Sequence, residues 1–431
     1  MADSPHSAEM LAGRGKRGKI KDDTPTAMDS LGLYISIPFC RSKCSYCNFA
    51  SGVYPSSAFP GYVDRLCGDL ERMRAWAEEQ KAPLPRRVDS IYLGGGTPSI
   101  LPPDLLQRLF AEIHRQFRVA PSAEITIECA PGQIDDAFLE GMQHCGVNRV
   151  SFGVQSFVDR EAAVTGRLHN CEVALRDVKR VQSAGIASVN VDLIAGLPYQ
   201  TMESWHESLK TLAATGADHA SIYMLEVDDG SRLGRELLAD GGRYHAAAVP
   251  DDDAMAEMYL EAIGFLREQG IEQYEISNFA RVGAESRHNL RYWQRQPYLG
   301  LGVDAHSMLI AEDGHTLRLA TTDDLGEYLA GPRDPSILHL SEVEQMEEEW
   351  FLGLRLARGV SLGTLTRQYG RAKVDAFRPV LSELLEEKLL EKYAGRLRLT
   401  SRGRLISNDV FARFIAVTSE ESSRPELISV V

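Results

Sequence analysis

Between residues 33 and 225 the sequence alternates apolar, β-branched runs with longer stretches whose apolar residues recur at helical spacing. The expected strands span residues 33–39, 88–93, 124–128, 149–155, 188–194 and 219–225. The expected helices between them span residues 58–79, 102–117, 134–145, 171–184 and 201–214. Strands that alternate with crossover helices in this way predict an α/β fold, with a parallel sheet closed or partly closed into a (β/α)6 TIM-like barrel.

Three cysteines, Cys40, Cys44 and Cys47, follow the first expected strand. Chemistry in parallel barrels lies on the loops where strands end, so these thiolates are expected on a rigid edge. Three thiolates suit a [4Fe-4S] cluster with one iron left open. Zinc is less suited, because it needs a closed set of four ligands and no His or Cys follows before Cys67. Three incidental thiols are the structural alternative.

Other polar and glycine residues also follow expected strands. The run Gly94-Gly95-Gly96-Thr97 lacks the spacing of a dinucleotide-binding motif, but its glycines would let backbone groups approach a ligand closely. Carboxylates at strand ends could bind an ammonium or hydroxyl groups, and Arg167 could bind a carboxylate. Taken singly, each could instead form a salt bridge on the barrel rim. The strand-end set is Gly94 to Thr97, Glu128, Gln155, Arg167 and Asp192.

Composition narrows the class of protein. With 431 residues, 44% of them hydrophobic, the chain can bury a large core, and its net charge of −14 argues against nucleic acid or an anionic membrane as the main partner. Seven cysteines in this arrangement do not form a disulfide framework, which indicates a reducing compartment. The sequence has neither a spanning apolar run nor a signal peptide. We therefore expect a cytoplasmic protein.

Four regions are expected along the chain: a disordered leader over residues 1–30, the barrel over 31–240, a barrel extension over 241–340 and a C-terminal domain over 341–431. The last region is predicted to be smaller, mostly helical and winged-helix-like. Its expected elements are helices over 342–357, 362–368 and 373–388 and a hairpin over 390–399. Glutamates crowd the third helix and would repel phosphate, so we interpret the domain as a lid or docking domain.

The CxxxCxxC spacing, with Tyr46 before the last cysteine, resembles the radical S-adenosylmethionine superfamily. In that superfamily the open iron binds S-adenosylmethionine, and an electron from the cluster cleaves it to a 5′-deoxyadenosyl radical. The wider set of strand-end motifs, together with Tyr292-Trp293, resembles the oxygen-independent coproporphyrinogen dehydrogenase family over nearly the whole chain from Leu33. By this resemblance S-adenosylmethionine contacts Tyr34, Tyr46, Gly95, Gly96, Thr97, Glu128, Gln155, Arg167 and Asp192.

Two branches of this family differ at the residues that follow the third cysteine. The dehydrogenases resemble CxxxCxxCxC, whereas this chain has Asn48-Phe49 there, which favours the HemW branch of haem chaperones. The resemblance then implies haem bound at His288, Asn289, Tyr292 and Trp293, with His288 as the proposed contact. From the residues alone, a polar turn beside two core aromatics is the alternative. Other candidate haem ligands are His306, His169 and Cys171.

The resemblance implies a protein that transfers haem to recipient haemoproteins, with respiratory proteins as candidates. The acidic net charge predicts that it does not bind nucleic acid. Peripheral membrane association and a homodimer are left open. The rival function is that of the dehydrogenase, in which the 5′-deoxyadenosyl radical starts the oxidative decarboxylation of two propionates of coproporphyrinogen III.

Overall fold

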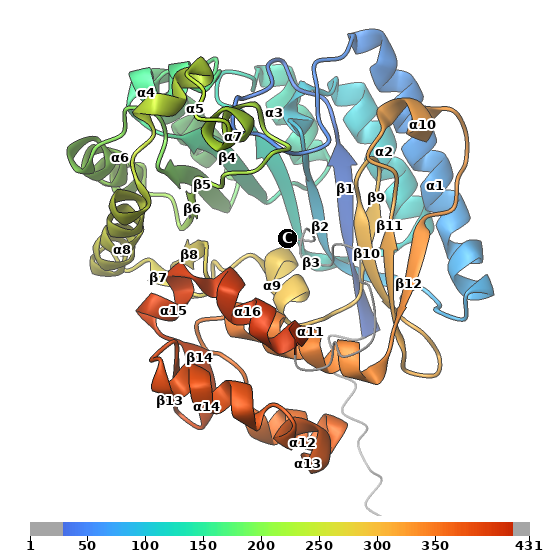
Figure 1. The fold of residues 1–431 in the computed structure, drawn as a ribbon. Coiled ribbons are helices and arrows are strands. Elements are labelled where there is room, and N and C mark those ends of the chain that lie inside the picture. Colours follow the sequence, from blue (N-terminus) through green and yellow to red (C-terminus); the bar gives the residue numbers. More distant parts are fainter. Residues whose placement is uncertain (1–28, 417–431) are drawn as a thin grey trace, which may run out of the picture.

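The computed structural model describes residues 29–416, and β1 to β6 form the predicted parallel sheet at its centre (Figure 1). Each strand pairs with the next along the chain, and all these pairings are parallel. The six strands are β1 Ser30–Ile37, β2 Arg87–Gly95, β3 Arg118–Cys129, β4 Arg149–Gln155, β5 Ser188–Ala195 and β6 His219–Met224. All six expected strands are confirmed, and β3 begins six residues before the expected start at residue 124 because its first part continues the pairing with β2.

The five expected crossover helices are confirmed, and helices lie around the outside of the curved sheet (Figure 1). They are α1 Phe59–Glu79, α2 Pro103–Gln116, α3 Asp136–His144, α5 Cys171–Ser183 and α6 Met202–Ala214. Thr201 begins α6 with a capping box, in which its side chain accepts from the amide of Ser204 and the Ser204 side chain accepts in return. The short helices α4 Asp159–Val164 and α7 Arg232–Leu238 lie in strand-to-helix loops and were not predicted.

Further strands extend the sheet at both edges, so the barrel is partial rather than closed. The strand order runs β12-β11-β10-β9-β1-β2-β3-β4-β5-β6-β8-β7, with β9 parallel to β1 and the outer strands antiparallel. These strands are β7 Glu272–Gln273, β8 Asn278–Ala280, β9 Tyr298–Leu301, β10 His306–Ile310, β11 Thr316–Ala320 and β12 Ser336–Leu340. The helices of this region are α8 Asp252–Glu268, α9 Arg287–Trp293 and α10 Leu325–Leu329.

The two faces of the sheet differ in chemistry, and this difference determines where a ligand can bind. On β1 and β5 the outward residues Leu33, Ile35, Val191 and Leu193 are fully buried against helices. Inward residues alternate with them and are mostly polar, among them Asp192 on β5. Tyr223 on β6 is 42% exposed although its strand lies inside the sheet. The interior of the curved sheet is therefore a polar hollow rather than a second apolar core.

The C-terminal domain has its own apolar core and lies next to α9 (Figure 1). Its elements are α11 Glu342–Arg355, α12 Leu362–Tyr369, α13 Arg371–Asp375, α14 Arg378–Glu386, β13 Leu390–Tyr393, β14 Arg396–Leu399, α15 Ser401–Leu405 and α16 Ser407–Ala416. The hairpin is confirmed. The single helix expected over residues 373–388 is wrong: α14 begins at Arg378 with Pro379 in its first turn. A proline there cannot donate to the carbonyl of Asp375, and its ring clashes with that carbonyl, so the chain breaks between α13 and α14.

Several expectations fall outside these observations. The expected leader lies outside the described residues, except for residues 29 and 30, and the division of the chain at residues 240 and 340 stays a prediction. No helix within residues 29–416 is long and apolar enough to cross a membrane.

Candidate cluster and cofactor site

The three cysteines lie on the loop that leaves the carboxyl end of β1, at the top of the sheet in Figure 1. The loop closes on itself, because the amide of Cys40 donates to the carbonyl of Gly52 at 2.9 Å. Neighbouring loops hold its far side: the amide of Ser45 donates to Thr165 at 3.0 Å, and the amide of Leu233 donates to Ser45 at 2.8 Å. Backbone hydrogen bonds thus fix the loop from several sides.

Each thiol has one polar side chain beside it. Thr97 Oγ1 lies 3.6 Å from Cys40 Sγ, Arg167 Nη1 lies 3.6 Å from Cys44 Sγ, and Ser51 Oγ lies 3.8 Å from Cys47 Sγ. Among the residues that the structure describes, no three His, Cys, Asp or Glu side chains surround one point where a single ion could bind. A cubane does not need such a point, since each thiolate binds a different iron atom. The three thiols and their hydrogen-bond donors therefore fit a [4Fe-4S] cluster.

The glycine run after β2 packs directly against the cysteine loop. The amide of Gly96 donates to the Ile37 carbonyl at 2.8 Å, and the amide of Thr97 donates to the Phe39 carbonyl at 2.8 Å. A Cβ on Gly96 would lie 2.8 Å from both of these carbonyl oxygens, and Gly95 has a φ of +98°. The glycines thus approach the backbone that carries Cys40, and their contact with a ligand stays a prediction.

Two inward carboxylates, Glu128 and Asp192, lie on β3 and β5. The Tyr92 hydroxyl donates to Glu128 Oε1 at 2.8 Å, and Asn190 Nδ2 donates to Asp192 Oδ1 at 2.6 Å. Burial raises the pKa of Glu128 to about 7, partly opposed by the Tyr92 hydrogen bond. Burial also raises the pKa of Asp192. Both groups have unused acceptor capacity towards the hollow, which suits an ammonium or a pair of hydroxyls.

Gln155 and Arg167 join the end of β4 to the cysteine loop. Gln155 has a φ of +69°, and its buried Oε1 has no hydrogen-bond partner. Arg167 contacts Cys44 Sγ with one nitrogen and donates to the Gly153 carbonyl with another. A strained backbone and an unpartnered amide oxygen at a strand end are typical of a ligand-binding position.

Two tyrosines lie at opposite levels of the hollow. Tyr34 on β1 stacks on Tyr92, with ring centroids 6.1 Å apart. Tyr46 packs against the apolar cluster of Ile194, Leu197 and Leu225 above β5 and β6. Tyr46 therefore lies on the cysteine side of the hollow. Tyr34 instead belongs to a row of stacked rings, Tyr34, Tyr92 and His288, which we call the aromatic row and which leads away from the cysteines.

The floor of the hollow is the helix α9, and the segment predicted to bind haem forms this helix. The side chain of His288 is fully buried: its Nδ1 lies 3.0 Å from Ser90 Oγ and its Nε2 lies 2.8 Å from the Tyr292 hydroxyl. Its ring stacks on Tyr92 at 5.4 Å. Burial lowers the pKa of His288 to about 3, with a further contribution from the charge of Arg291. The imidazole is thus neutral, and both ring nitrogens are engaged.

The four residues of the predicted haem segment do not share one face. His288 and Tyr292 are one turn apart and face the hollow. Trp293 is 5% exposed and packs with Leu352 of the C-terminal domain, with the Arg355 guanidinium 4.2 Å above its ring. Asn289 is half-buried, and its backbone N–H donates to Ser286 Oγ at 3.3 Å. The structure therefore brings together His288 and Tyr292, whereas Trp293 contacts the edge of Tyr292 and packs into the C-terminal domain.

The other candidate ligands lie elsewhere. His169 is buried, its Nε2 lies 3.2 Å from the Val154 carbonyl, and burial lowers its pKa to about 4. His306 on β10 is partly exposed, with Nε2 3.8 Å from Asp304 Oδ1. Cys171 begins α5. Of these groups, the His306 ring has the weakest contact, since 3.8 Å is beyond hydrogen-bond distance.

Some polar groups of the site were not predicted, because their partners are distant in sequence. The side chain of Asn48, in the pair Asn48-Phe49 that separates the two family branches, donates to Asp228 at 2.6 Å. Glu124 accepts from the amides of Arg287 and His288 at 2.9 Å each and so begins α9. Neither pair has a local sequence signal. An acidic residue at an inward strand position was the only available hint for Glu124.

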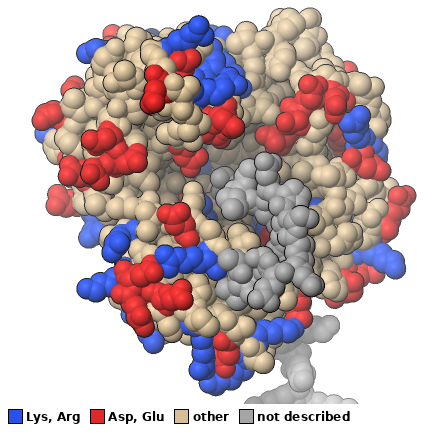
Figure 2. Space-filling model, viewed as in Figure 1, with Lys and Arg blue, Asp and Glu red and all other residues tan. Residues whose placement is uncertain are grey.

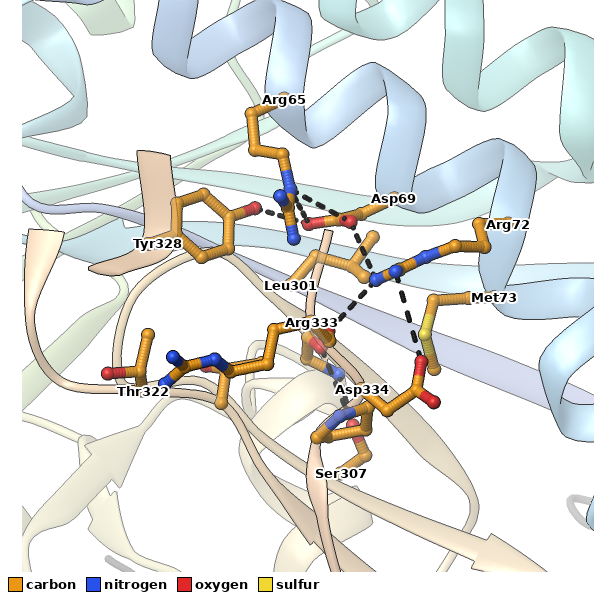
Figure 3. A pocket seen from close by; sticks show the side chains of 13 residues that line it. Arg65, Asp69, Arg72, Met73, Leu301, Ser307, Thr322, Tyr328, Arg333 and Asp334 are labelled. Carbon is orange, nitrogen blue, oxygen red and sulfur yellow. Dashed lines mark hydrogen bonds and ion pairs between the residues drawn. The ribbon is translucent and has the colours of Figure 1, made fainter. Parts of the chain in front are cut away.

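A separate pocket lies on the outer face of the sheet, between α1 and the strands β9 to β11 (Figure 3). Its centre is Asp69, which accepts from Arg65 at 3.1 Å, Arg72 at 3.1 Å and the Tyr328 hydroxyl at 2.6 Å. The carboxylate is saturated by these donors. The pocket is thus a structural ion network that holds α10 against α1, away from the cysteines.

Comparison with known proteins gives the family. The radical SAM superfamily profile matches residues 34–212, and the HemN C-terminal domain profile matches residues 340–406. The chain is 33% identical over 385 residues to the haem chaperone HemW of Bacillus subtilis, covering 89% of this chain and 98% of the relative. The chain belongs to the HemW family. The HemW protein of Escherichia coli is 32% identical over 394 residues, covering 90% of this chain and 98% of the relative.

Further relatives support the same fold. The mitochondrial radical S-adenosyl methionine domain-containing protein 1 of Bos taurus is 35% identical over 341 residues, covering 76% of this chain and 74% of the relative. The solved structure of coproporphyrinogen III oxidase (HemN) from Escherichia coli superposes with a TM-score of 0.76 at 23% identity, covering 90% of this chain and 91% of that one. The predicted partial barrel of the radical SAM type is therefore confirmed, and the HemW membership confirms the branch that Asn48-Phe49 indicated.

Proposed function

We propose that this protein is a haem chaperone that binds haem, a [4Fe-4S] cluster and S-adenosylmethionine and passes haem to recipient haemoproteins. The observation that carries the proposal is the match to HemW chaperones over about nine tenths of both chains. The pair Asn48-Phe49, in place of a further cysteine, supports the same branch. Respiratory haemoproteins as recipients, a cytoplasmic location, peripheral membrane association and a homodimer remain predictions.

Cys40, Cys44 and Cys47 would hold the cluster, which, when bound, supplies the electron that can cleave S-adenosylmethionine. Thr97 and Arg167 would donate to the thiolates and so stabilise their negative charge. The proposed contacts to S-adenosylmethionine are Tyr34, Tyr46, Gly95, Gly96, Thr97, Glu128, Gln155, Arg167 and Asp192. Glu128 and Asp192 suit its ammonium and hydroxyl groups, and the unpartnered Gln155 Oε1 suits a donor of the ligand.

The haem site is proposed at the floor of the hollow, beside His288 and Tyr292. Tyr34 and Tyr92 stack there and offer flat faces to a porphyrin. To bind iron, His288 would have to release either Ser90 or Tyr292, because both ring nitrogens are engaged. His306, with its looser contact, is the second candidate for the ligand. Asn289 and Trp293 would support α9 rather than touch the porphyrin face.

Two titrations test the haem proposal. Purified protein with a reconstituted cluster should bind one haem per chain and pass it to an apo-haemoprotein; failure of either step contradicts the chaperone function. The same absorption titration on His288→Ala and on His306→Ala, with His144→Ala on the exposed end of α3 as the matched control, identifies the ligand. Loss of the imidazole-ligated spectrum in only one of the first two variants assigns it.

A second candidate function is the oxygen-independent dehydrogenation of coproporphyrinogen III. The specific observation in its favour is that this chain retains the whole strand-end set on a fold that superposes on HemN. An anaerobic assay with dithionite, S-adenosylmethionine and coproporphyrinogen III separates the two functions. Protoporphyrinogen formation would favour the enzyme, and haem transfer without it would favour the chaperone.

A further inference from the structure

Arg149 is a buried cation inside the hollow whose guanidinium has no hydrogen-bond partner among the described residues. It is the first residue of β4 and shares the inward face with Ser151 and Gln155, two and six residues further along the strand. It is 3% exposed, and its Nε is fully enclosed and unpartnered. Within residues 29–416 its guanidinium makes neither a hydrogen bond nor an ion pair. Enclosing a guanidinium in this way is costly unless a ligand or a counter-ion compensates for it.

A second unpartnered donor lies on the next strand. In the parallel pairing of β3 with β4, Thr126 is the register partner of Arg149. Thr126 is fully buried, and its Oγ1 also has no hydrogen-bond partner. Tyr92, which carries the stacked ring of His288, is the register partner of Thr126 on β2. A guanidinium and a hydroxyl, both unpartnered, therefore lie side by side at the level of the aromatic row.

Acidic side chains near Arg149 do not satisfy it. Burial raises the pKa values of Glu128 and Asp192, and the charge of Arg149 partly offsets this rise. Neither carboxylate contacts Arg149. Its charge also lowers the pKa values of His219 and His288, which face the same space. Arg149 thus creates a positive field at the floor without a direct anionic partner. In Figure 2 the described residues on this side of the molecule leave a recess near the centre of the face.

We propose that Arg149, together with the Thr126 hydroxyl, binds a propionate of the porphyrin at the floor of the hollow. The inference rests on the proposed haem binding. A carboxylate accepts two parallel hydrogen bonds from a guanidinium and a further one from a hydroxyl, which matches the unpartnered groups. No covalent step is involved.

The position of Arg149 along β4 favours a porphyrin over S-adenosylmethionine as the source of the carboxylate. Arg149 begins the strand and Gln155 ends it, and six residues of extended strand span about 20 Å. The cysteine loop lies at the Gln155 end, whereas His288 and Tyr92 lie at the Arg149 end. A carboxylate held near the cluster would be out of reach of Arg149, while a porphyrin on the aromatic row would not.

The test compares haem with haem dimethyl ester, which has the same ring and iron but no propionate charge. Binding is titrated with the reconstituted wild-type protein, Arg149→Met, Arg149→Lys and Thr126→Val. Arg118→Met, an exposed arginine at the start of β3, is the matched control. Charged hydrogen bonds of this kind are each worth about a 10- to 100-fold change in affinity. Wild type should therefore bind haem at least about 10-fold more tightly than the ester.

In Arg149→Met the affinity for haem should fall to that for the ester, while ester binding stays as in wild type. Arg149→Lys should retain part of the preference, Thr126→Val should weaken haem several-fold, and Arg118→Met should change nothing. If the preference for haem persists in Arg149→Met, or both ligands weaken equally, the inference is wrong. A selective loss of S-adenosylmethionine binding in Arg149→Met would assign the residue as a counter-ion of Glu128 and Asp192 instead.

Failure of haem binding and failure of the propionate contact give different results. Wild type that binds neither haem nor the ester contradicts the proposed function, and the inference falls with it. Wild type that binds both equally keeps haem binding but contradicts a propionate site. Cluster absorbance and far-UV circular dichroism of each variant show whether the barrel has folded, and Arg149→Lys gives an informative comparison even if Arg149→Met does not fold.

Discussion

Glu128 makes the stability of the barrel depend on pH, and the substitution Glu128→Gln should remove this dependence. Burial raises the pKa of this carboxyl from 4.5 to about 7 in the folded chain. The folded state therefore holds a proton between these values that the unfolded chain has released. The resulting stabilisation is complete below about pH 4.5 and is lost as the pH rises through about 7, which is the sign expected for a raised carboxyl pKa.

The magnitude follows from the two pKa values. One pKa unit corresponds to about 1.4 kcal/mol, so the whole effect is about 3 kcal/mol, of which about 2 kcal/mol lies between pH 5.5 and 8.5. Glutamine keeps an oxygen that can accept the Tyr92 hydroxyl bond of 2.8 Å but cannot ionise. The difference in unfolding free energy between wild type and Glu128→Gln should therefore change by about 2 kcal/mol across this range, with the variant the more stable at pH 8.5.

Urea unfolding followed by circular dichroism, under anaerobic conditions at several pH values, measures this difference. Contributions from other groups cancel, because wild type and variant are compared at the same pH. Glu140→Gln, on the exposed surface of α3, is the matched control and should leave the pH dependence unchanged. A carboxylic-acid infrared band that disappears near pH 7 in wild type and is absent in Glu128→Gln would identify the group. Parallel stability curves for wild type and Glu128→Gln would refute the reasoning.

Three further predictions concern the cluster loop and the domain contact. Cys40→Ala, Cys44→Ala or Cys47→Ala should abolish the brown chromophore, since two thiolates do not hold a cubane, whereas Cys67→Ala and Cys145→Ala should keep it. Iron and sulfide analysis measures the cluster content, and full retention in the first three variants would disprove the cluster. Asn48→Ala loses the 2.6 Å contact to Asp228 and should lower the unfolding free energy by less than about 1 kcal/mol, but a chelator should remove iron from the variant faster than from wild type. An unchanged rate of iron release would show that the contact does not hold the cysteine loop. Arg295→Met removes the 2.9 Å bond to the buried Glu348, which keeps Arg318 at 2.8 Å, and should lower the unfolding free energy by about 1.5–3 kcal/mol. The exposed Arg371→Met control should lose less than about 1 kcal/mol, and equal small losses would contradict a buried ion pair.

The barrel could be predicted from the sequence because its elements are long and their signals agree. Strands β1 to β6 carry β-branched runs, and their helices have caps such as Thr201 that act within a few residues. The outer strands β7 to β12 have two to five residues each, which is too short for a period to be recognised. They exist because the edges of the sheet offer unpaired backbone groups, a property of the assembled fold rather than of any segment.

For the candidate site, the positions of the residues were predictable and their contacts were not. Strand ends converge in a parallel barrel, so Glu128, Gln155 and Asp192 were expected on one rim. The contact of Arg167 with Cys44 joins residues 123 positions apart, and nothing near either residue encodes it. The strained backbone of Gln155 was also hidden, since non-glycine residues at positive φ are held there by their surroundings.

The segment from His288 to Trp293 shows why a motif and a site are different things. As a motif, its histidine and aromatics form one group suited to haem. As the helix α9, it divides them: His288 faces the barrel floor, and Trp293 faces Leu352 of the C-terminal domain. The helix is itself begun by Glu124 of β3, so barrel and C-terminal domain are joined through it. A ligand that releases His288 from Tyr292 therefore acts on a helix that both parts share, so haem binding at this motif would be felt at the joint between them.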